Sequence, residues 1–194
     1  MPRFTSLALF PFHKMTLLVA WFATLVCGGD LWAQYEVSSW RDHFPYGAAE
    51  EVIVANGEVV ARTPNALFSV DTATYEVSRF VKGQGLSQSN PTALGYDAFR
   101  GQLVVAYDDG GIDLRSSLGV TNIPDLRIAQ VVGSKRIQAV TIVGDEAYLS
   151  SAVGVIVLDL EKQEIADTWR LTPAAVPVDA RCVMAFEGQW LVGT

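Results

Sequence analysis

Few side chains in this sequence have the types and spacing that catalysis or metal binding needs. His43 follows Asp42, and a histidine beside a carboxylate can act as a general base. A covalent triad or a zinc site needs several such groups, but beyond residue 33 only His43 and Cys182 could serve, and they lie far apart in the sequence. We therefore interpret the His43–Asp42 pair as a surface or capping contact. Cys182 precedes Val183 and Met184, so we expect a thiol buried in a strand.

Three other groups of residues could carry binding chemistry, and each has a simpler structural interpretation. The segment 108–113 (DDGGID) is rich in oxygen ligands for calcium, but it lacks further spaced acidic residues and has the composition of a turn. The glycines of 83–85 (GQG) do not form a nucleotide loop, because no parallel βα unit follows. Tyr107, Trp169 and Trp190 could line a sugar-binding face, but at strand positions we expect them between sheets. We predict no catalytic, cofactor-binding or metal-binding residues.

The elements around these residues are repeated strand hairpins. Residues 103–106 (LVVA) read as a buried strand, 108–111 (DDGG) as a turn, and 112–114 (IDL) as a second strand. Ile112 lies 44 residues after Phe68 and 44 residues before Ile156. A period near 44 residues built from strand hairpins is typical of a four-stranded propeller blade. The sequence therefore predicts an all-β fold, a β-propeller.

The turn and strand signals define three four-stranded antiparallel blades and one further hairpin. Asn56-Gly57 is the strongest turn signal, because both central positions of a type I′ turn need positive φ. The expected strands are 51–55, 58–63, 67–71 and 75–80; then 92–96, 102–107, 111–115 and 120–123; then 138–143, 147–150, 155–160 and 165–171; and finally 181–186 and 190–192.

Equivalent apolar positions in these blades should be buried between them. The expected set in the second strands is Val60, Val104, Leu149 and Leu191, and in the third strands Phe68, Ile112 and Ile156. About three and a half blades do not close a ring, which normally takes roughly four to eight. We therefore expect residues 34–194 to be the N-terminal part of a longer propeller, here an incomplete arc.

Residues 1–33 have the pattern of a secretory signal peptide. His13-Lys14 precede the apolar run that starts at Thr16, and 31–33 (LWA) approximates a cleavage site. The run is too short for a membrane anchor. Val26 is too large for the position before a lipidated Cys27, which disfavours a lipoprotein. We therefore expect an exported chain with no transmembrane span after cleavage. The acidic balance of the whole sequence, a formal net charge of −7, argues against nucleic-acid binding.

Several segments resemble a known family. The pattern from Gly85-Leu86-Ser87 to the hairpin 101–112 is similar to the two-component-regulator type of propeller repeat. The heptad 40–46 (WRDHFPY) after a signal peptide is similar to the start of PorZ-like proteins of Bacteroidetes. Residues 103–114, 122–125 (NIPD) and 147–161 extend that likeness over nearly all of the mature chain.

The resemblance implies a cell-surface or periplasmic component of the type IX secretion system. Such proteins resemble two propellers followed by a β-sandwich, and they act in the complex that attaches cargo to anionic lipopolysaccharide. The implied partners are other secretion-complex proteins and lipopolysaccharide. We expect a non-enzymatic interaction module without a cofactor. The alternatives are the periplasmic sensor propeller of a hybrid two-component regulator and a propeller enzyme acting on polysaccharide.

Overall fold

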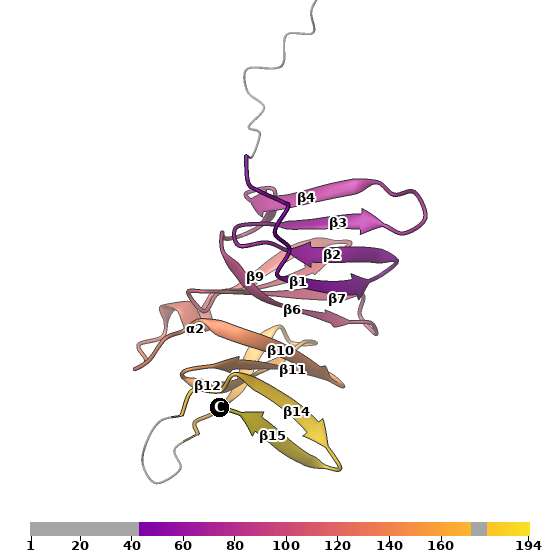
Figure 1. The fold of residues 1–194 in the computed structure, drawn as a ribbon. Coiled ribbons are helices and arrows are strands. Elements are labelled where there is room, and N and C mark those ends of the chain that lie inside the picture. Colours follow the sequence, from indigo (N-terminus) through magenta and orange to yellow (C-terminus); the bar gives the residue numbers. More distant parts are fainter. Residues whose placement is uncertain (1–42, 172–177) are drawn as a thin grey trace, which may run out of the picture. The chain divides into compact units, whose positions relative to one another are not determined.

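The structure, a computed structural model, describes residues 43–171 and 178–194 (Figure 1). These residues form short strands and one single-turn helix. The elements are β1 (Glu51–Ala55), β2 (Glu58–Arg62), β3 (Leu67–Asp71), β4 (Val77–Lys82), β5 (Gly85–Leu86), β6 (Pro91–Asp97), β7 (Gln102–Tyr107), β8 (Ile112–Ser116), β9 (Gly119–Ile123), α2 (Asp125–Ile128), β10 (Ile137–Val143), β11 (Glu146–Ser151), β12 (Gly154–Asp159), β13 (Glu164–Trp169), β14 (Cys182–Phe186) and β15 (Gln189–Gly193). No helix among the described residues is long and apolar enough to cross a membrane.

Each sheet pairs strands of one repeat only, in the order of the chain. The first sheet is β1–β5, the second β6–β9, the third β10–β13, and the fourth is the hairpin β14–β15. All neighbours pair antiparallel except β5, which adds a short parallel edge to β4. Asn56 and Gly57 have φ of 49° and 80°, as the predicted β1–β2 turn requires. The all-β fold is confirmed as an incomplete β-propeller, whose described sheets do not close a ring.

Two elements were absent from the prediction. The parallel strand β5 (Gly85–Leu86) lies between the predicted strands 75–80 and 92–96, where no strand was expected. The helix α2 lies between the predicted strands 120–123 and 138–143, where no helix was expected. Both are very short, so neither leaves a periodic pattern in the sequence, and Leu126 of α2 is buried through its contact with the sheets.

Three apolar interfaces hold neighbouring sheets face to face (Figure 1). The first interface joins Val60 and Leu67 of the first sheet to Val105 and Tyr107 of the second. The second interface joins the second and third sheets through side chains that include Val104, Ile112, Leu149 and Ile156. The third interface joins the third sheet to the fourth and contains Tyr148, Val155, Val157 and Val183.

The predicted equivalence of the apolar positions is partly wrong. Val60, Val104, Leu149, Ile112 and Ile156 are buried, but Phe68 is only partly buried and Leu191 is 48% exposed. Ile112 and Ile156 lie in the same interface, so Ile112 points to the following sheet and Ile156 to the preceding one.

For the third-strand positions Phe68, Ile112 and Ile156, the prediction failed because the loops between the second and third strands differ in length. The last pairs before these loops are Arg62–Leu67, Ala106–Ile112 and Ser151–Gly154, so the three loops differ in length. A shift of one residue turns a strand side chain to the opposite face. Third-strand residues that are 44 positions apart therefore do not all point to the same side of their sheets. Phe68 lies on the face of the first sheet that is away from the second, where its ring meets Tyr46 edge-on at 5.9 Å.

Gly95 lies where the second and third sheets approach closely, and its replacement tests that packing. A Cβ at this position would lie 2.5 Å from Cγ1 of Val140, so that side chain must move. We expect Gly95→Ala to destabilise the domain by about 1–3 kcal/mol, the usual cost of overpacking. Gly47→Ala is the control, because nothing lies within 4 Å of a Cβ there. Denaturant unfolding of both variants measures the difference, and equal stabilities would contradict this packing.

Candidate functional site

A polar pocket lies where the loops after the second and fourth strands of neighbouring repeats meet. Its volume is about 270 Å³. The lining residues come from loops or strand ends of the first three sheets: Glu50, Arg62, Pro64, Asn90, Pro91, Thr92, Asp108 and Arg136. We call it the Arg62 pocket. Because its walls come from segments far apart in the sequence, only the stacking of the sheets assembles it.

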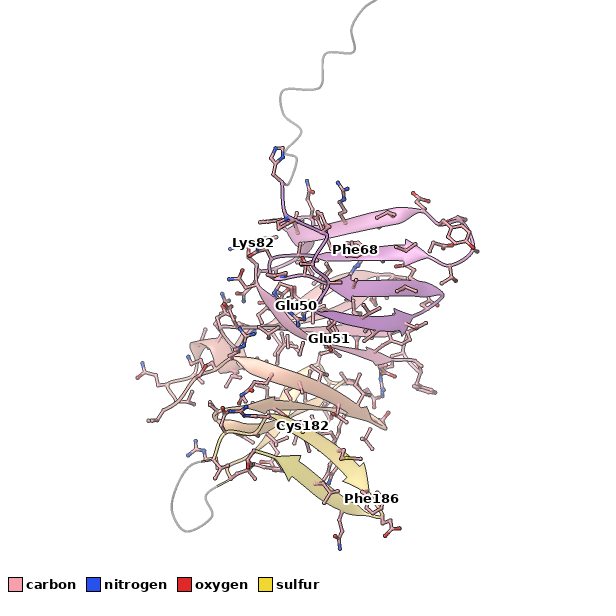
Figure 2. The ribbon with its side chains drawn as sticks, viewed as in Figure 1. Glu50, Glu51, Phe68, Lys82, Cys182 and Phe186 are labelled. Atoms are coloured by element: carbon pink, nitrogen blue, oxygen red, sulfur yellow. The ribbon has the colours of Figure 1, made fainter. Side chains whose placement is uncertain are left out.

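Arg62 is the buried charge of this pocket and pairs with two carboxylates. Its Nη1 lies 2.6 Å from Oε2 of Glu50, and its Nε lies 3.1 Å from Oε2 of Glu51. Nη1 also donates to the carbonyl of Pro91 at 3.2 Å. The same oxygen of Glu51 accepts the backbone N–H of Leu94 at 3.1 Å, so these charges join the first two sheets. Figure 2 shows Glu50 and Glu51 side by side at the start of β1.

The rim of the Arg62 pocket offers groups of both signs. Arg136 is exposed, and no described residue pairs with its guanidinium. Across the pocket, Oδ2 of Asp108 accepts a hydrogen bond from Asn90 at 3.3 Å. The hydroxyl of Thr92 donates to the carbonyl of Ala106 at 3.2 Å. This arrangement can bind charged or hydroxylated groups by hydrogen bonds. Its residue types suit a ligand-binding site.

The segment 108–113 forms the turn that its composition predicts. Gly110 has φ of 86°, and Oδ1 of Asp109 accepts the N–H of Gly111 at 2.9 Å. Asp113 is instead fully buried, at 0% exposure, on the second sheet. The acidic residues of this segment therefore serve separate structural roles, in the turn and within the sheet.

Asp113 is the acceptor at the centre of a buried hydrogen-bond network. Its Oδ2 accepts the hydroxyl of Tyr107 at 2.6 Å and the N–H of Ser87 at 2.7 Å. Its Oδ1 accepts Nδ2 of Asn122 at 2.7 Å. Burial raises the pKa of Tyr107 well above its ordinary value, and the hydrogen bond to Asp113 adds to this effect. Tyr107 therefore stays protonated, and its hydroxyl donates the hydrogen bond that holds the Asp113 carboxylate in place. Sequence reasoning missed this network because its members lie on four separate segments.

The remaining candidates from the sequence are dispersed. His43 is exposed at the start of the described residues, and Asp42 lies outside them. The prediction of a buried Cys182 is wrong, because this thiol is exposed. Figure 2 shows Cys182 and Phe186 on the hairpin β14–β15. Val183, the next residue along the strand, is 3% exposed in the third interface, so strand alternation turns the Cys182 side chain to the uncovered face.

Tyr107 is buried between sheets, as predicted, whereas Trp169 and Trp190 are only partly buried. Tyr107 belongs to the first interface, and Trp169 and Trp190 pack against the third. The rings of Trp169 and Trp190 are 5.4 Å apart, and Tyr148 stacks on Trp190 at 4.0 Å. Burial raises the pKa of Tyr148 to about 12, helped by its hydrogen bond to Glu146. The glycines 83–85 also have a structural role, since 85–86 form strand β5.

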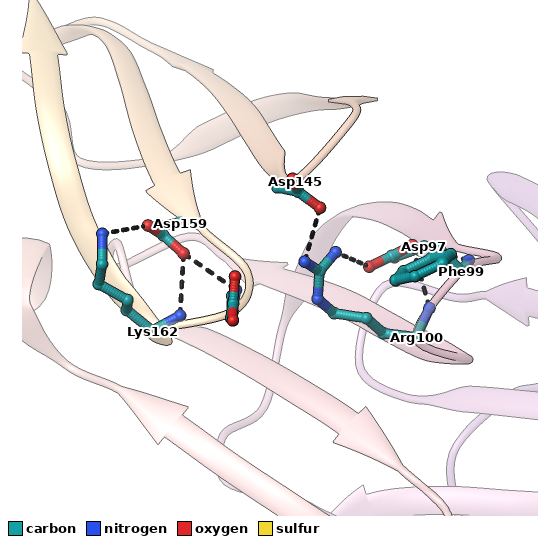
Figure 3. A network of polar contacts seen from close by, with 7 residues as sticks. Asp97, Phe99, Arg100, Asp145, Asp159 and Lys162 are labelled. Carbon is teal, nitrogen blue, oxygen red and sulfur yellow. Dashed lines mark hydrogen bonds and ion pairs between the residues drawn. The ribbon is translucent and has the colours of Figure 1, made fainter.

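A charged network also joins two sheets at the turns between first and second strands. Arg100 lies 3.0 Å from Oδ2 of Asp97 in its own repeat and 2.6 Å from Oδ1 of Asp145 in the next (Figure 3). The hydrogen bond to Asp145 contributes most to raising the pKa of Arg100. Asp159 and Lys162 form a separate pair within the third repeat at 2.7 Å (Figure 3). The Arg100–Asp145 and Asp159–Lys162 contacts each include an exposed partner, so these two contacts add little stability.

The stacked four-stranded sheets and their loop pocket define a β-propeller domain. The family model of the N-terminal β-propeller domain of PorZ, a protein of the type IX secretion system, matches residues 59–189. The chain belongs to this family.

Solved structures agree with this assignment. PorZ of Porphyromonas gingivalis, described as an essential bacterial surface component of the type IX secretion system, is 30% identical with a TM-score of 0.59. The match covers 62% of this chain and 16% of that protein, so this chain spans about a sixth of its length. The extracellular domain of a proposed one-component system from B. thetaiotaomicron is 16% identical with a TM-score of 0.53, covering 69% of this chain and 17% of that one.

A more distant similarity shows the fold alone. AztD from Citrobacter koseri is 14% identical with a TM-score of 0.50, and the match covers 72% of this chain and 39% of that protein. The comparison with curated proteins found no match.

Proposed function

We propose that this chain is part of an exported, non-enzymatic interaction module of the type IX secretion attachment complex. The observation that carries the proposal is the family match over residues 59–189, together with 30% identity to PorZ. The geometry supports a binding role, since the Arg62 pocket presents hydrogen-bonding and charged groups from three sheets. Its partners are other proteins of the secretion complex and anionic lipopolysaccharide, and it acts in the periplasm or on the outer-membrane surface.

We further propose that residues 1–33 are a signal peptide and that residues 34–194 are part of a larger propeller. Residues 1–42 lie outside the described residues. The uncovered face of β14–β15 supports the proposal that a further sheet packs there, because this face presents apolar side chains. Met184, Phe186 and Leu191 are each about half exposed. Such a face is normally buried against a neighbouring blade.

Disruption of the gene in its host bacterium tests the role in secretion. We expect cargo proteins to lose their surface attachment and to recover it when the wild-type gene is restored. Complementation with Arg136→Glu should restore less attachment, because the change reverses the free charge at the rim of the Arg62 pocket. Lys82→Glu is the control, since Lys82 carries the same charge, is exposed and does not line the pocket (Figure 2). Normal cargo attachment after disruption would refute the proposal.

The alternative is the sensor propeller of a hybrid two-component regulator, which shares this repeat type. The similarity to the one-component system at 16% identity supports the fold and not the role. The complete gene distinguishes the two proposals. A second propeller and a β-sandwich after residue 194 would favour secretion, whereas a transmembrane helix and kinase motifs would favour the sensor.

A further inference from the structure

A second pocket, of about 220 Å³, lies between the first and second sheets at the opposite, hairpin-turn ends of their strands. Its walls include Asn56 and Glu58 of the β1–β2 hairpin, and Ser116 and Ser117 at the end of β8. Val60 and Leu103 supply apolar surface. Arg115 is the cation of this pocket, which we call the Arg115 pocket.

The guanidinium of Arg115 stacks on Phe80, and no residue in the described part of the chain accepts a hydrogen bond from it. Its Cζ lies 3.5 Å from the centre of the Phe80 ring, a stacked contact that uses one face of the group. A guanidinium also carries five N–H donors in its plane. Among the described residues, none accepts a hydrogen bond from it or forms an ion pair with it. Arg62 differs in this respect, since Glu50 and Glu51 already pair with it.

The surroundings of Arg115 favour an anionic ligand. Burial lowers the pKa of the Arg115 guanidinium, and the nearby Glu58 only partly opposes that effect. A partly buried guanidinium has lost part of its hydration. A carboxylate would restore the lost interactions, because its two oxygens match the fork of the guanidinium.

The other lining residues restrict the ligand. The carboxylate of Glu58 disfavours a group with two negative charges, such as a phosphate monoester. Val60 and Leu103 favour an apolar substituent next to the charge, and Asn56 and Ser116 can donate further hydrogen bonds. The volume admits only a small group.

We propose that the Arg115 pocket binds a carboxylate that carries a small apolar group. The same chemistry is present in a free short-chain acid and in the C-terminal residue of a peptide. The inference does not depend on the proposed role in secretion, since it rests on the geometry of the first two sheets.

Calorimetric titration of the full-length protein with sodium butyrate tests the pocket. We expect saturable binding of about millimolar strength, because so small a molecule makes few contacts. Butyramide, which has the same shape without the charge, should bind at least about tenfold more weakly. A dipeptide ending in valine, with its C-terminus either free or amidated, distinguishes the sources: tighter binding than butyrate only with the free C-terminus indicates a peptide ligand, and weaker binding indicates a free acid.

Three variants assign the binding to this pocket. Arg115→Met should weaken butyrate binding at least about tenfold, and Arg115→Lys should weaken it less, because it keeps the charge but not the fork. Glu58→Gln should tighten binding severalfold by removing a repulsive charge, an effect that a loss of fold would not produce. Equal binding of butyrate and butyramide, no saturable butyrate binding, or unchanged butyrate binding in both Arg115→Met and Glu58→Gln would overturn the proposal.

Discussion

Ile112→Ala should destabilise the propeller by about 2–5 kcal/mol, the range found for large-to-small changes in packed cores. Ile112 is fully buried in the second interface, where it faces the third sheet. Its removal deletes apolar contacts and leaves a cavity between two rigid sheets, which cannot easily close it. Denaturant unfolding of the full-length protein, followed by fluorescence, measures the loss.

The matched control is Ile128→Ala. This isoleucine is 70% exposed on α2, so the same change of side chain there should cost less than about 1 kcal/mol. The contrast between the two isoleucines isolates burial between sheets from the intrinsic effect of the substitution. A loss below about 1 kcal/mol for Ile112→Ala would show that the second interface is not packed as described.

Asp113→Ala should be as damaging, for an electrostatic reason. The change removes the acceptor of three hydrogen bonds and leaves the hydroxyl of Tyr107 and the N–H of Ser87 without their partner. Unpaired buried polar groups cost about 1–3 kcal/mol each, so we expect a total loss of about 3–5 kcal/mol. Asp125→Ala is the control, since Asp125 is exposed and its side chain accepts no hydrogen bond among the described residues.

A double-mutant cycle separates the network from general damage to the fold. Tyr107→Phe alone removes one donor to Asp113, so its cost should be smaller than that of Asp113→Ala. Combined with Asp113→Ala, it should add little, because the hydroxyl has already lost its acceptor. Full additivity of the two losses would contradict the coupling between these side chains.

The sequence by itself determined the repeat and most of the strands. Alternating apolar residues and turn signals such as Asn56-Gly57 predicted hairpins, and β1, β3 and β7 begin and end where expected. These features are local, since the preferences of a strand and of a tight turn depend on a few adjacent residues. The 44-residue spacing then identified the propeller, and the heptad 40–46 and related segments identified its family.

Only the tertiary structure decided which face each strand side chain occupies and which charges meet. Loops of different length turned Ile112 and Ile156 toward each other, and the alternation of β14 exposed Cys182. Arg115 reaches Phe80, and Arg100 reaches Asp145, across sheet boundaries that no local pattern encodes. The physical reason is that a strand has two faces one residue apart, so a small change in a loop reassigns every contact beyond it.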